Sequence, residues 1–291
     1  FLSTPVIDPA YVDDVMPAML AAVQHDSELP KVLHLHSFEQ EMPCFAVLQR
    51  ELTRQGGAQR ILDETNRPYA TRDEGVKKSG STRKKLRQDW NRLSALGAVD
   101  VVNDRTPVRV REAFEAFLKL EQASWKGARG TALLCDDADA SFVRELVAKL
   151  AAEGRASVAL LRVDGKAIAT QVVMYSGRTA YTWKTAFDAE YARYSPGMLL
   201  VDKVTDQLFA DPTIESIDSC SYEDGFMAKL WTARRKMVEM LVHVGPGTSA
   251  AFALEQARLL GYHEAKRIRN QWRARRAATP PQAKAPLAQA S

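Results

Sequence analysis

Residues 156–186 contain the pattern that most narrows the choice of folds, because three β-rich segments follow one another with very short connections. The segments are 156–163 (ASVALLRV), 166–175 (KAIATQVVMY) and 179–186 (TAYTWKTA). Asp164-Gly165 and Ser176-Gly177 separate them, and such pairs are typical of tight hairpin turns. Strands joined in this way pair with their neighbours in opposite directions. The sequence therefore predicts an antiparallel three-stranded meander in the middle of the chain.

Helical periodicity precedes this meander. Ser81 or Thr82 is the expected N-cap of a first helix, which Gly97 ends, and two more helices are expected near 108–124 and 139–152. Each helix has one apolar stripe that we expect to face a core. The stripes are Leu86, Trp90, Leu93 and Leu96, then Phe114, Phe117 and Leu118, then Phe142, Val143, Leu146, Val147 and Leu150.

Helices and strands alternate after the meander. Ser195-Pro196-Gly197 opens a helix that Asp211-Pro212 ends. A strand at 214–220, a short helix at 224–234 and a strand at 237–244 complete the order β-β-β-α-β-α-β. The first 75 residues show a similar alternation, with helices at 9–24 and 44–55 and strands at 31–37 and 58–70. A helix at 249–275 and a Pro/Ala-rich end, which we expect to be disordered, follow.

The composition excludes several classes of protein. With 46% hydrophobic and 26% charged residues in 291, the sequence is neither disordered nor fibrous. No apolar run approaches the roughly 20 residues that span a bilayer, so no membrane insertion is expected. The three cysteines (Cys44, Cys135 and Cys220) lie far apart, which argues against a disulfide framework and favours the cytoplasm. The start at Phe1, without a signal peptide, indicates a fragment boundary.

The net charge of +4 is unevenly distributed along the chain. Residues 76–92 carry seven Lys or Arg against Asp89, and residues 262–291 carry seven against Glu264. Two basic segments on an acidic remainder favour an anionic partner such as a phosphate group or a nucleic acid. A solvated helix face and a frayed tail explain the same charges, and no recognisable nucleic-acid-binding module accompanies them.

Common catalytic motifs are missing from the sequence, which has no GxxxxGK[ST] loop, no GxGxxG, no HExxH and no GxSxG. His34 and His36 share one face of a predicted strand, but no Cys, Asp or Glu at ligand spacing joins them. We therefore expect a structural or surface role for this pair, and no metal. Cys135 and Cys220 have no histidine nearby, which argues against a thiol nucleophile.

The turn at Ser195-Pro196-Gly197 has two interpretations. It places the N–H groups of Gly197 and Met198 and a helix dipole at the end of a central strand, which suits a pyrophosphate. An ordinary helix with a serine cap and an initial proline explains the same three residues without a ligand.

The element order, with this turn before the long helix, resembles the GNAT acyltransferase fold, so the expected fold class is mixed α/β. Several strings also resemble the CelD-like acetyltransferases associated with cellulose biosynthesis, relatives of the FemAB peptidyltransferases that contain two GNAT-like halves. The strings are 81–87 (STRKKLR), Arg92-Leu93, Gly97, Ser124-Trp125-Lys126, 194–200 (YSPGMLL), Asp218 and Lys229-Leu230-Trp231. Tyr-Ser-Pro-Gly replaces the usual Gly-rich phosphate loop. The resemblance implies a tandem arrangement, with a truncated first half at 1–75, a complete GNAT domain at 76–247 and a basic helical tail at 248–291.

The resemblance further implies an acyl-CoA-dependent N-acyltransferase, in which an amine attacks the thioester of acetyl-CoA or another acyl-CoA directly. The acceptor would be an amino sugar or small amine of exopolysaccharide or cell-envelope synthesis. Asp218, with a pKa raised by burial, would take the proton from the ammonium, and Tyr222 would protonate the thiolate. A strand-end cap to the turn at 221–225 is the alternative for Asp218. Coenzyme-binding residues would be Trp183, Lys184, Thr185, Ser195, Gly197, Met198 and Leu199, and acceptor-binding residues Trp125, Lys126 and Lys229.

Two other functions stay open on the sequence. A FemAB-like peptidyltransferase would use aminoacyl-tRNA held by the basic segments, and its binding would weaken steeply with salt. A non-catalytic module that has kept only the fold would bind acyl-CoA without turnover.

Overall fold

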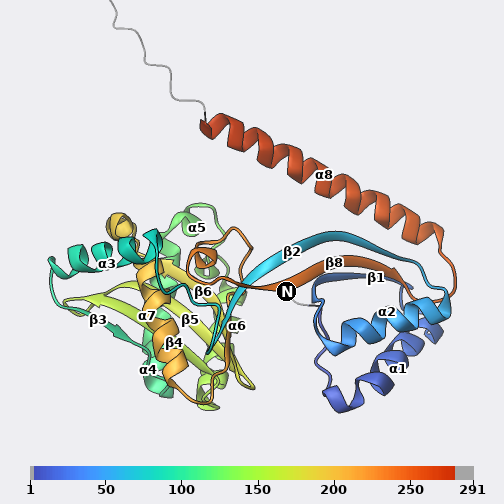
Figure 1. Cartoon of the computed structure of the whole chain (residues 1–291), viewed down its shortest axis with the longest axis horizontal. Coiled ribbons are helices and arrows are strands. Elements are labelled where there is room, and N and C mark those ends of the chain that lie inside the picture. Colours follow the sequence, from blue (N-terminus) through green and yellow to red (C-terminus); the bar gives the residue numbers. More distant parts are fainter. Residues whose placement is uncertain (1–2, 279–291) are drawn as a thin grey trace, which may run out of the picture. The chain divides into compact units, whose positions relative to one another are not determined.

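The computed structural model describes residues 3–278, which fall into two compact units (Figure 1). The second unit is Thr65–Lys236, and the first combines the chain up to Glu64 with the chain from Met237. Strands β2 (Gln59–Thr71) and β8 (Ala233–His243) continue from one unit into the other. The units divide the chain at residues 64 and 236, whereas the sequence placed its domain boundaries at 75 and 247.

The second unit contains the predicted meander, which is confirmed. Strands β4 (Ala156–Val163), β5 (Lys166–Ser176) and β6 (Thr179–Phe187) pair antiparallel in sequence order. Asp164 and Gly165 both have positive φ, at 48° and 80°, as a tight hairpin requires. The short strand β3 (Val99–Val102), which the sequence analysis missed, pairs antiparallel with β4, and β7 (Ser216–Asp218) pairs parallel with β6. Over the described residues, the strand order is β1-β8-β2-β7-β6-β5-β4-β3, so the sheet is mixed and the mixed α/β class is confirmed.

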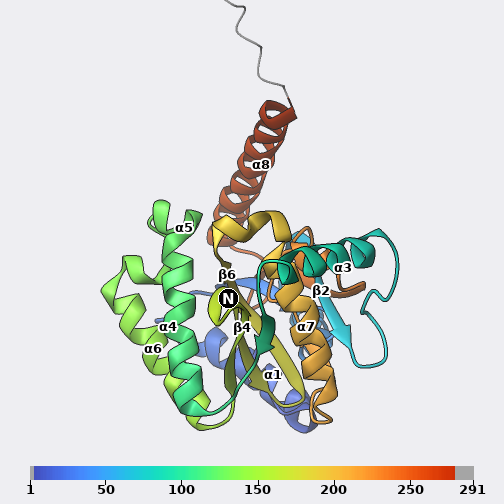
Figure 2. The same cartoon turned by 90° about the vertical axis from the view of Figure 1, so that its left-hand side faces the viewer.

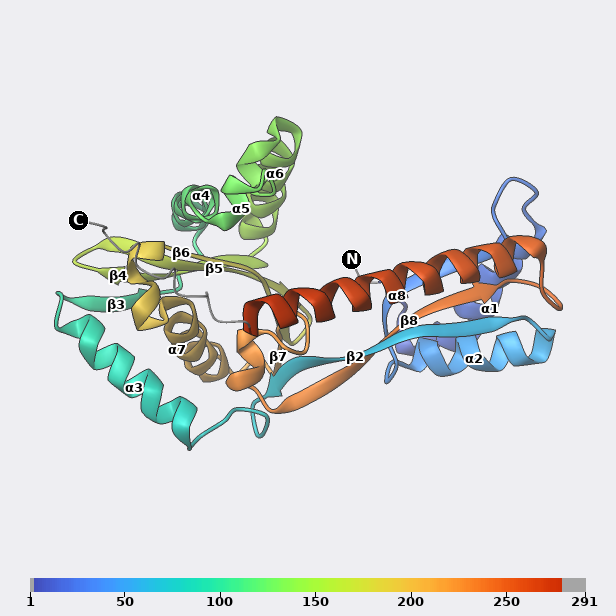
Figure 3. The same cartoon turned by 90° about the horizontal axis from the view of Figure 1, so that it is seen from above.

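Two layers of helices cover the sheet of the second unit (Figures 2 and 3). One layer contains α4 (Pro107–Ala123), α5 (Trp125–Ala128), η2 (Leu133–Cys135) and α6 (Asp137–Ala152); the other contains α3 (Ser81–Ser94), η3 (Ala189–Tyr194) and α7 (Pro196–Ala210). Side chains from the two faces of these strands pack against different helix layers. Val158 and Val172 pack with α4 and α6. Leu161 and Val173 pack with α3 and α7. Both faces of these strands are therefore buried.

Several predicted details of the second unit are wrong. Gly80, with φ 94°, precedes the first helical residue of α3, so neither Ser81 nor Thr82 is the cap. Leu96 lies beyond the end of α3 and is 47% exposed, so it does not belong to the buried stripe of that helix. Phe142 is 63% exposed, because Val143 and Val147 define the buried stripe of α6. The helix expected at 224–234 is only the single turn η4 (Phe226–Lys229), because β8 already begins at Ala233. The strand expected at 214–220 is reduced to the three residues of β7.

The first unit contains the remaining elements. Helices α1 (Val12–His25), preceded by η1 (Pro9–Tyr11), and α2 (Pro43–Gln55) pack on one face of β1 (Val32–Glu39) and β8. Helix α8 (Ala250–Ala278) packs on the other face through Phe252 and Leu259, which contact Leu241 of β8 (Figure 1). The predicted helices and strands of the first 75 residues are thus confirmed, as is the helix after 249. The Pro/Ala-rich end from 279 onward lies outside the described residues.

Among residues 3–278, none of the helices combines the length and the apolar character that crossing a bilayer requires.

Candidate active site

Strand β6 is paired differently along its two edges. β5 follows one edge as far as Phe187, but β7 follows the other edge only from Thr179 to Tyr181, which lies opposite Asp218. Beyond this point, no strand in the described part of the chain pairs with the 182–187 edge on the β7 side. This edge therefore has no strand partner beyond Tyr181, and an edge of this kind is where an extended ligand adds to a sheet as a strand does.

The N-terminus of α7 lies beside this edge of β6. A Cβ added to Gly197 would lie 3.6 Å from the Phe187 ring and 3.7 Å from the methyl group of Thr185. Ser195 has a left-handed conformation, with φ 53°, and its side chain does not cap the helix. Within residues 3–278, the N–H groups of Gly197 and Met198 have no hydrogen-bond acceptor. Free amide groups at a helix N-terminus form an anion site.

A buried glutamine on β5 lies next to the same place. The Gln171 side chain is fully buried, and its Nε2 donates to Thr185 Oγ1 at 3.4 Å. Its Oε1 atom has no hydrogen-bond partner within the described residues. A buried acceptor left unpaired costs about 1–3 kcal/mol, so a ligand N–H group at this position would be favoured. Gln171 was not assigned from the sequence, although a glutamine inside the apolar run 166–175 is a visible signal.

A basic groove of about 550 Å³ lies between α3 and α7. Its lining includes Lys78, Gly80, Arg83, Arg87, Trp90, Leu199, Asp202 and Lys203. Lys203 Nζ lies 5.0 Å from the centre of the Trp90 ring, and Arg83 forms an ion pair with Asp202. Burial raises the pKa of Asp202 despite this arginine, and the neighbouring Asp206 raises it further. Since Leu199 and Lys203 belong to the first two turns of α7, the groove continues from the free amides. The basic segment 76–92 of the sequence supplies the lysine and arginines of its α3 side.

Two residues predicted to bind different substrates meet on one carboxylate. Lys184 Nζ and Lys126 Nζ lie 2.9 and 3.0 Å from Oε1 of Glu121, which is fully buried at the end of α4. The Leu133 N–H group donates to the other oxygen at 3.0 Å. Burial by itself raises the pKa of Glu121, but these donors outweigh it and hold the pKa below its usual value. Glu121 was not predicted from the sequence, although this residue continues the buried stripe of Phe114, Phe117 and Leu118 one turn further.

Asp218 is buried at the end of β7, with 1% of its surface exposed. Arg235 Nη1 donates to its Oδ2 at 2.8 Å, and the Cys220 N–H group donates to its Oδ1 at 2.8 Å. Arg67 Nη1 lies 3.6 Å from the same Oδ1. The structure therefore joins Asp218 to two arginines that sequence reasoning did not assign, and its assignment as the base stays a prediction.

The other predicted residues are more exposed. Tyr222 is 78% exposed in the turn after β7, and Lys229 is exposed at the end of η4. Trp125 is 62% exposed, and the Arg129 guanidinium lies 4.9 Å from its ring centre. Trp183 packs against the core formed by α4 and α6, so it faces away from α7.

The thiol of Cys220 does not resemble a nucleophile. Burial, reinforced by the negative charge of Asp218, raises its pKa to about 12. The thiol is therefore protonated at neutral pH, and a protonated thiol is a poor nucleophile.

Comparisons with known proteins agree with this architecture. Residues 80–226, half of the chain, match the family described as acetyltransferase (GNAT) domain. No curated protein matches the chain in sequence. The DUF2156 C-terminal domain of a protein from Agrobacterium fabrum, described as a lysylphosphatidylglycerol synthetase, aligns with a TM-score of 0.56 and 18% identity over 88% of this chain and 80% of that one.

Two further solved structures are similar. FemX aligns with a TM-score of 0.54 and 12% identity over 82% of this chain and 78% of its own. L-PGS from Bacillus licheniformis aligns with a TM-score of 0.52 and 14% identity over 87% and 80%. At such low identity the likeness concerns the fold alone.

Proposed function

Because the chain belongs to the family of acetyltransferase (GNAT) domains, we propose that it is an acyl-CoA-dependent N-acyltransferase. One observation carries the proposal: the unpaired 182–187 edge of β6 leads to the α7 N-terminus, where Gly197 and Met198 have free N–H groups. An extended chain of amides that ends in a pyrophosphate, as in coenzyme A, matches both features in the right order.

The coenzyme is proposed to lie along β6. Its pantetheine amides would hydrogen-bond to the backbone of residues 182–187, and its pyrophosphate would accept from Gly197 and Met198. The unpaired Gln171 Oε1 supports this fit, because a coenzyme amide N–H would supply the donor that the protein lacks. Lys85 Nζ, 3.1 Å from Ser195 Oγ, would add a positive charge near the pyrophosphate.

The groove between α3 and α7 is proposed to bind the far end of the coenzyme. Arg83, Arg87 and Lys203 would surround the 3′-phosphate, and Trp90 would offer an aromatic surface to the adenine. This proposal gives the basic segment 76–92 a specific anionic partner.

The reaction is proposed to be a direct transfer. The acceptor nitrogen attacks the thioester carbonyl carbon, a C–N bond forms, the C–S bond breaks and the coenzyme thiolate leaves. The ammonium proton must pass to a base and the thiolate must gain a proton, which are the roles predicted for Asp218 and Tyr222. The two hydrogen bonds and the Arg67 ion pair around Asp218 favour a further role, namely holding Arg67 and Arg235 in place.

The acceptor is proposed to approach from the α4 side of β6. Lys126 and Lys184 converge there on Glu121, and their remaining N–H bonds would donate to oxygens of the acceptor. A hydroxyl-rich amine such as an amino sugar suits such donors. The likeness of the quoted strings to CelD-like acetyltransferases supports an acceptor from exopolysaccharide or cell-envelope synthesis.

Coenzyme binding is tested by calorimetry with acetyl-CoA and with dephospho-CoA. We expect saturable acetyl-CoA binding that Gly197→Val removes while the fold persists, since the new side chain would fill the space before the free amides. Arg87→Gln should weaken acetyl-CoA binding about tenfold and leave dephospho-CoA binding nearly unchanged. Arg111→Gln, on the opposite helix layer, is the matched control. Unchanged affinity in Gly197→Val would contradict the placement of the pyrophosphate.

Turnover distinguishes the two other functions. Release of free coenzyme thiol in the presence of amino sugars supports the acyltransferase. Tight acetyl-CoA binding without turnover on any amine would indicate a binding module. Salt-sensitive binding of aminoacyl-tRNA in the absence of acetyl-CoA binding would indicate a FemAB-like transferase instead.

A further inference from the structure

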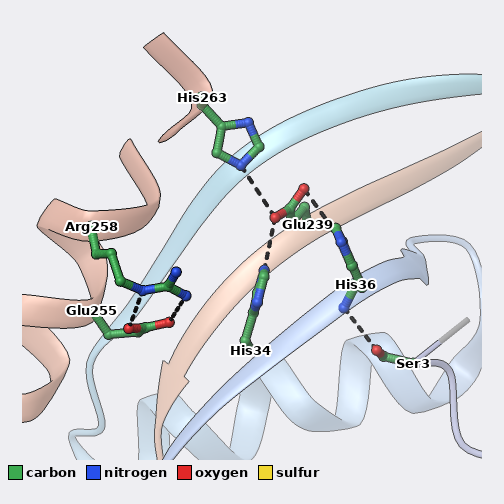
Figure 4. A network of polar contacts seen from close by, with 7 residues as sticks. All are labelled: Ser3, His34, His36, Glu239, Glu255, Arg258 and His263. Atoms are coloured by element: carbon green, nitrogen blue, oxygen red, sulfur yellow. Dashed lines mark hydrogen bonds and ion pairs between the residues drawn. The ribbon is translucent and has the colours of Figure 1, made fainter. Parts of the chain in front are cut away.

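Three of the five histidines of the chain converge on one carboxylate in the first unit. Figure 4 shows His34 and His36 of β1 and His263 of α8 directed at Glu239 of β8. His34 Nε2 lies 2.8 Å from Glu239 Oε1, His36 Nδ1 lies 3.4 Å from Oε2, and His263 Nε2 lies 3.2 Å from Oε1. The acyltransferase function proposed above uses none of these residues.

Strand alternation places His34 and His36 on one face of β1, and a β-bulge follows directly after them. The pairing of β1 with β8 shifts register between Leu35 and Phe38, and Ser37 in the bulge has a positive φ of 49°. Leu35 and Phe38 therefore both face the helices α1 and α2, while His34 and His36 stay together on the opposite face. Glu239 reaches the same face from β8, where its neighbour in the alternation, Leu241, packs against α8.

The set has the chemistry and the dimensions of a zinc site. Two imidazoles and one carboxylate are a ligand set that zinc uses when it keeps a fourth position open. Tetrahedral ligands roughly 2.0–2.1 Å from zinc lie about 3.3 Å from one another. The ligand atoms of His34, His36 and Glu239 all lie within 4.8 Å of one another, and the two closest His–Glu separations bracket that value.

The exposed fractions of these side chains suit a site that an ion can reach from the solvent. The side chain of Glu239 is 13% exposed, which orders it, whereas His34 and His36 are 28% and 59% exposed. An ion can therefore enter without local unfolding, and a water or another ligand can occupy the open position.

We propose that His34 Nε2, His36 Nδ1 and the Glu239 carboxylate bind one Zn²⁺ ion. His263 is a positioning residue: its Nε2 atom donates to Glu239 Oε1 and keeps the carboxylate turned toward the two ligand histidines. Asp63 lies within 4.8 Å of both His263 and Glu239 and extends this outer shell. Zinc would then cross-link β1 to β8 beneath α8.

The test titrates ZnCl₂ into the whole chain after removal of metals with a chelator. We expect one saturable site per chain by calorimetry and a concentration-dependent rise in Tm. His34→Gln and Glu239→Gln should abolish both effects. His36→Gln should do the same, and because His36 is the most exposed ligand, this variant keeps the test valid if the other two fold poorly. His25→Gln, at an exposed histidine of α1 outside the cluster, is the matched control and should bind as the wild type does.

Cobalt distinguishes this site from binding at the exposed thiol of Cys135. A Co²⁺ complex with nitrogen and oxygen ligands lacks the thiolate charge-transfer band. His263→Gln should lower the affinity for Co²⁺ without abolishing binding. The proposal is overturned if the wild type shows no saturable zinc binding, if His36→Gln binds like His25→Gln, or if cobalt shows the thiolate band.

Discussion

Lys184 of β6 and Glu121 of α4, 63 positions apart in the sequence, form an ion pair with an Nζ–Oε1 distance of 2.9 Å. The lysine lies on the part of β6 that β7 leaves unpaired, and the carboxylate is fully buried. Lys126 shares the same oxygen, so one buried negative charge holds two ammonium groups beside the proposed acceptor site. This pair thus links the packing of α4 on the sheet to the proposed chemistry.

Glu121→Gln should destabilise the protein by about 2–3 kcal/mol, because it removes charge-assisted hydrogen bonds from two lysines that are only 22% and 25% exposed. Urea denaturation measures this change. Glu115→Gln, which breaks the exposed pair with Arg144, is the control and should cost less than about 1 kcal/mol. Equal losses of unfolding free energy in the two variants would show that the buried cluster stabilises the protein no more than an exposed ion pair does.

The stabilisation by Glu121 should depend on pH in a defined direction. Its folded-state pKa is lowered, so its contribution is complete above the unfolded value of about 4.3 and is lost as the pH falls through the lower folded value. The difference in unfolding free energy between wild type and Glu121→Gln should therefore be constant near neutral pH and shrink below about pH 4. A difference that grows on acidification would contradict the direction of this shift.

Asp218→Asn should lower the unfolding free energy by about 3 kcal/mol, because it removes the buried negative charge that pairs with Arg67 and Arg235, which are 13% and 17% exposed. Asp100→Asn, at the more exposed pair with Arg162, is the control and should cost less than about 1 kcal/mol. If Asp218 holds the arginines in place, the pH profile of kcat/KM keeps its shape in the variant. Loss of the acidic limb, with a rate lower by a factor of about 100 or more, would instead identify Asp218 as the general base.

Gln171→Met should raise stability and weaken coenzyme binding at the same time. Methionine has a similar volume and removes the unpaired Oε1 atom, while only the long 3.4 Å hydrogen bond from Nε2 to Thr185 is lost, so the unfolding free energy should rise by about 1 kcal/mol. The coenzyme loses its proposed acceptor, so the Kd for acetyl-CoA should rise about tenfold. Gln207→Met on the exposed side of α7 should change neither quantity by this amount. A Gln171→Met variant that binds acetyl-CoA normally would remove Gln171 from the site.

Cys220 should resist alkylation by iodoacetamide at neutral pH, whereas Cys135 should react. A pKa of about 12 lowers the thiolate fraction of Cys220 to on the order of a thousandth of that of an ordinary thiol, while Cys135 is exposed. Mass spectrometry of the labelled peptides measures both rates. Asp218→Asn should accelerate the labelling of Cys220, because the negative charge of Asp218 contributes to the raised pKa.

The meander illustrates what local sequence predicts well. Apolar runs of strand length and turns such as Asp164-Gly165 act within a few residues, so β4, β5 and β6 follow from the sequence almost to the residue. The same holds for α7, which begins at Pro196 as expected. The predictions fail where contacts between distant segments determine the local structure. The Thr232 N–H group donates to the Gly75 carbonyl, and β8 starts directly afterwards at Ala233, so no helix continues through 224–234.

Only some residues of the candidate site were predicted from the sequence. Ser195, Gly197 and Met198 were predicted because a helix N-terminus has a local signature, and their binding role stays a prediction. Gln171 and Glu121 were not predicted, because the role of a polar residue in an apolar stripe depends on its partners in the fold. Gln171 bonds to Thr185, and Glu121 pairs with Lys126 and Lys184.

The sequence by itself thus determined the three-stranded meander, most of the helices and the start of α7 at Pro196, because hydrogen bonding and side-chain periodicity within a few residues specify them. Tertiary structure alone decided where β7 stops pairing with β6 and which charges meet on Glu121 and Asp218. It also decided that His34 and His36 face Glu239, 203 to 205 positions later in the chain. Contacts of that kind depend on the packing of whole layers, and a spacing along the chain does not encode them.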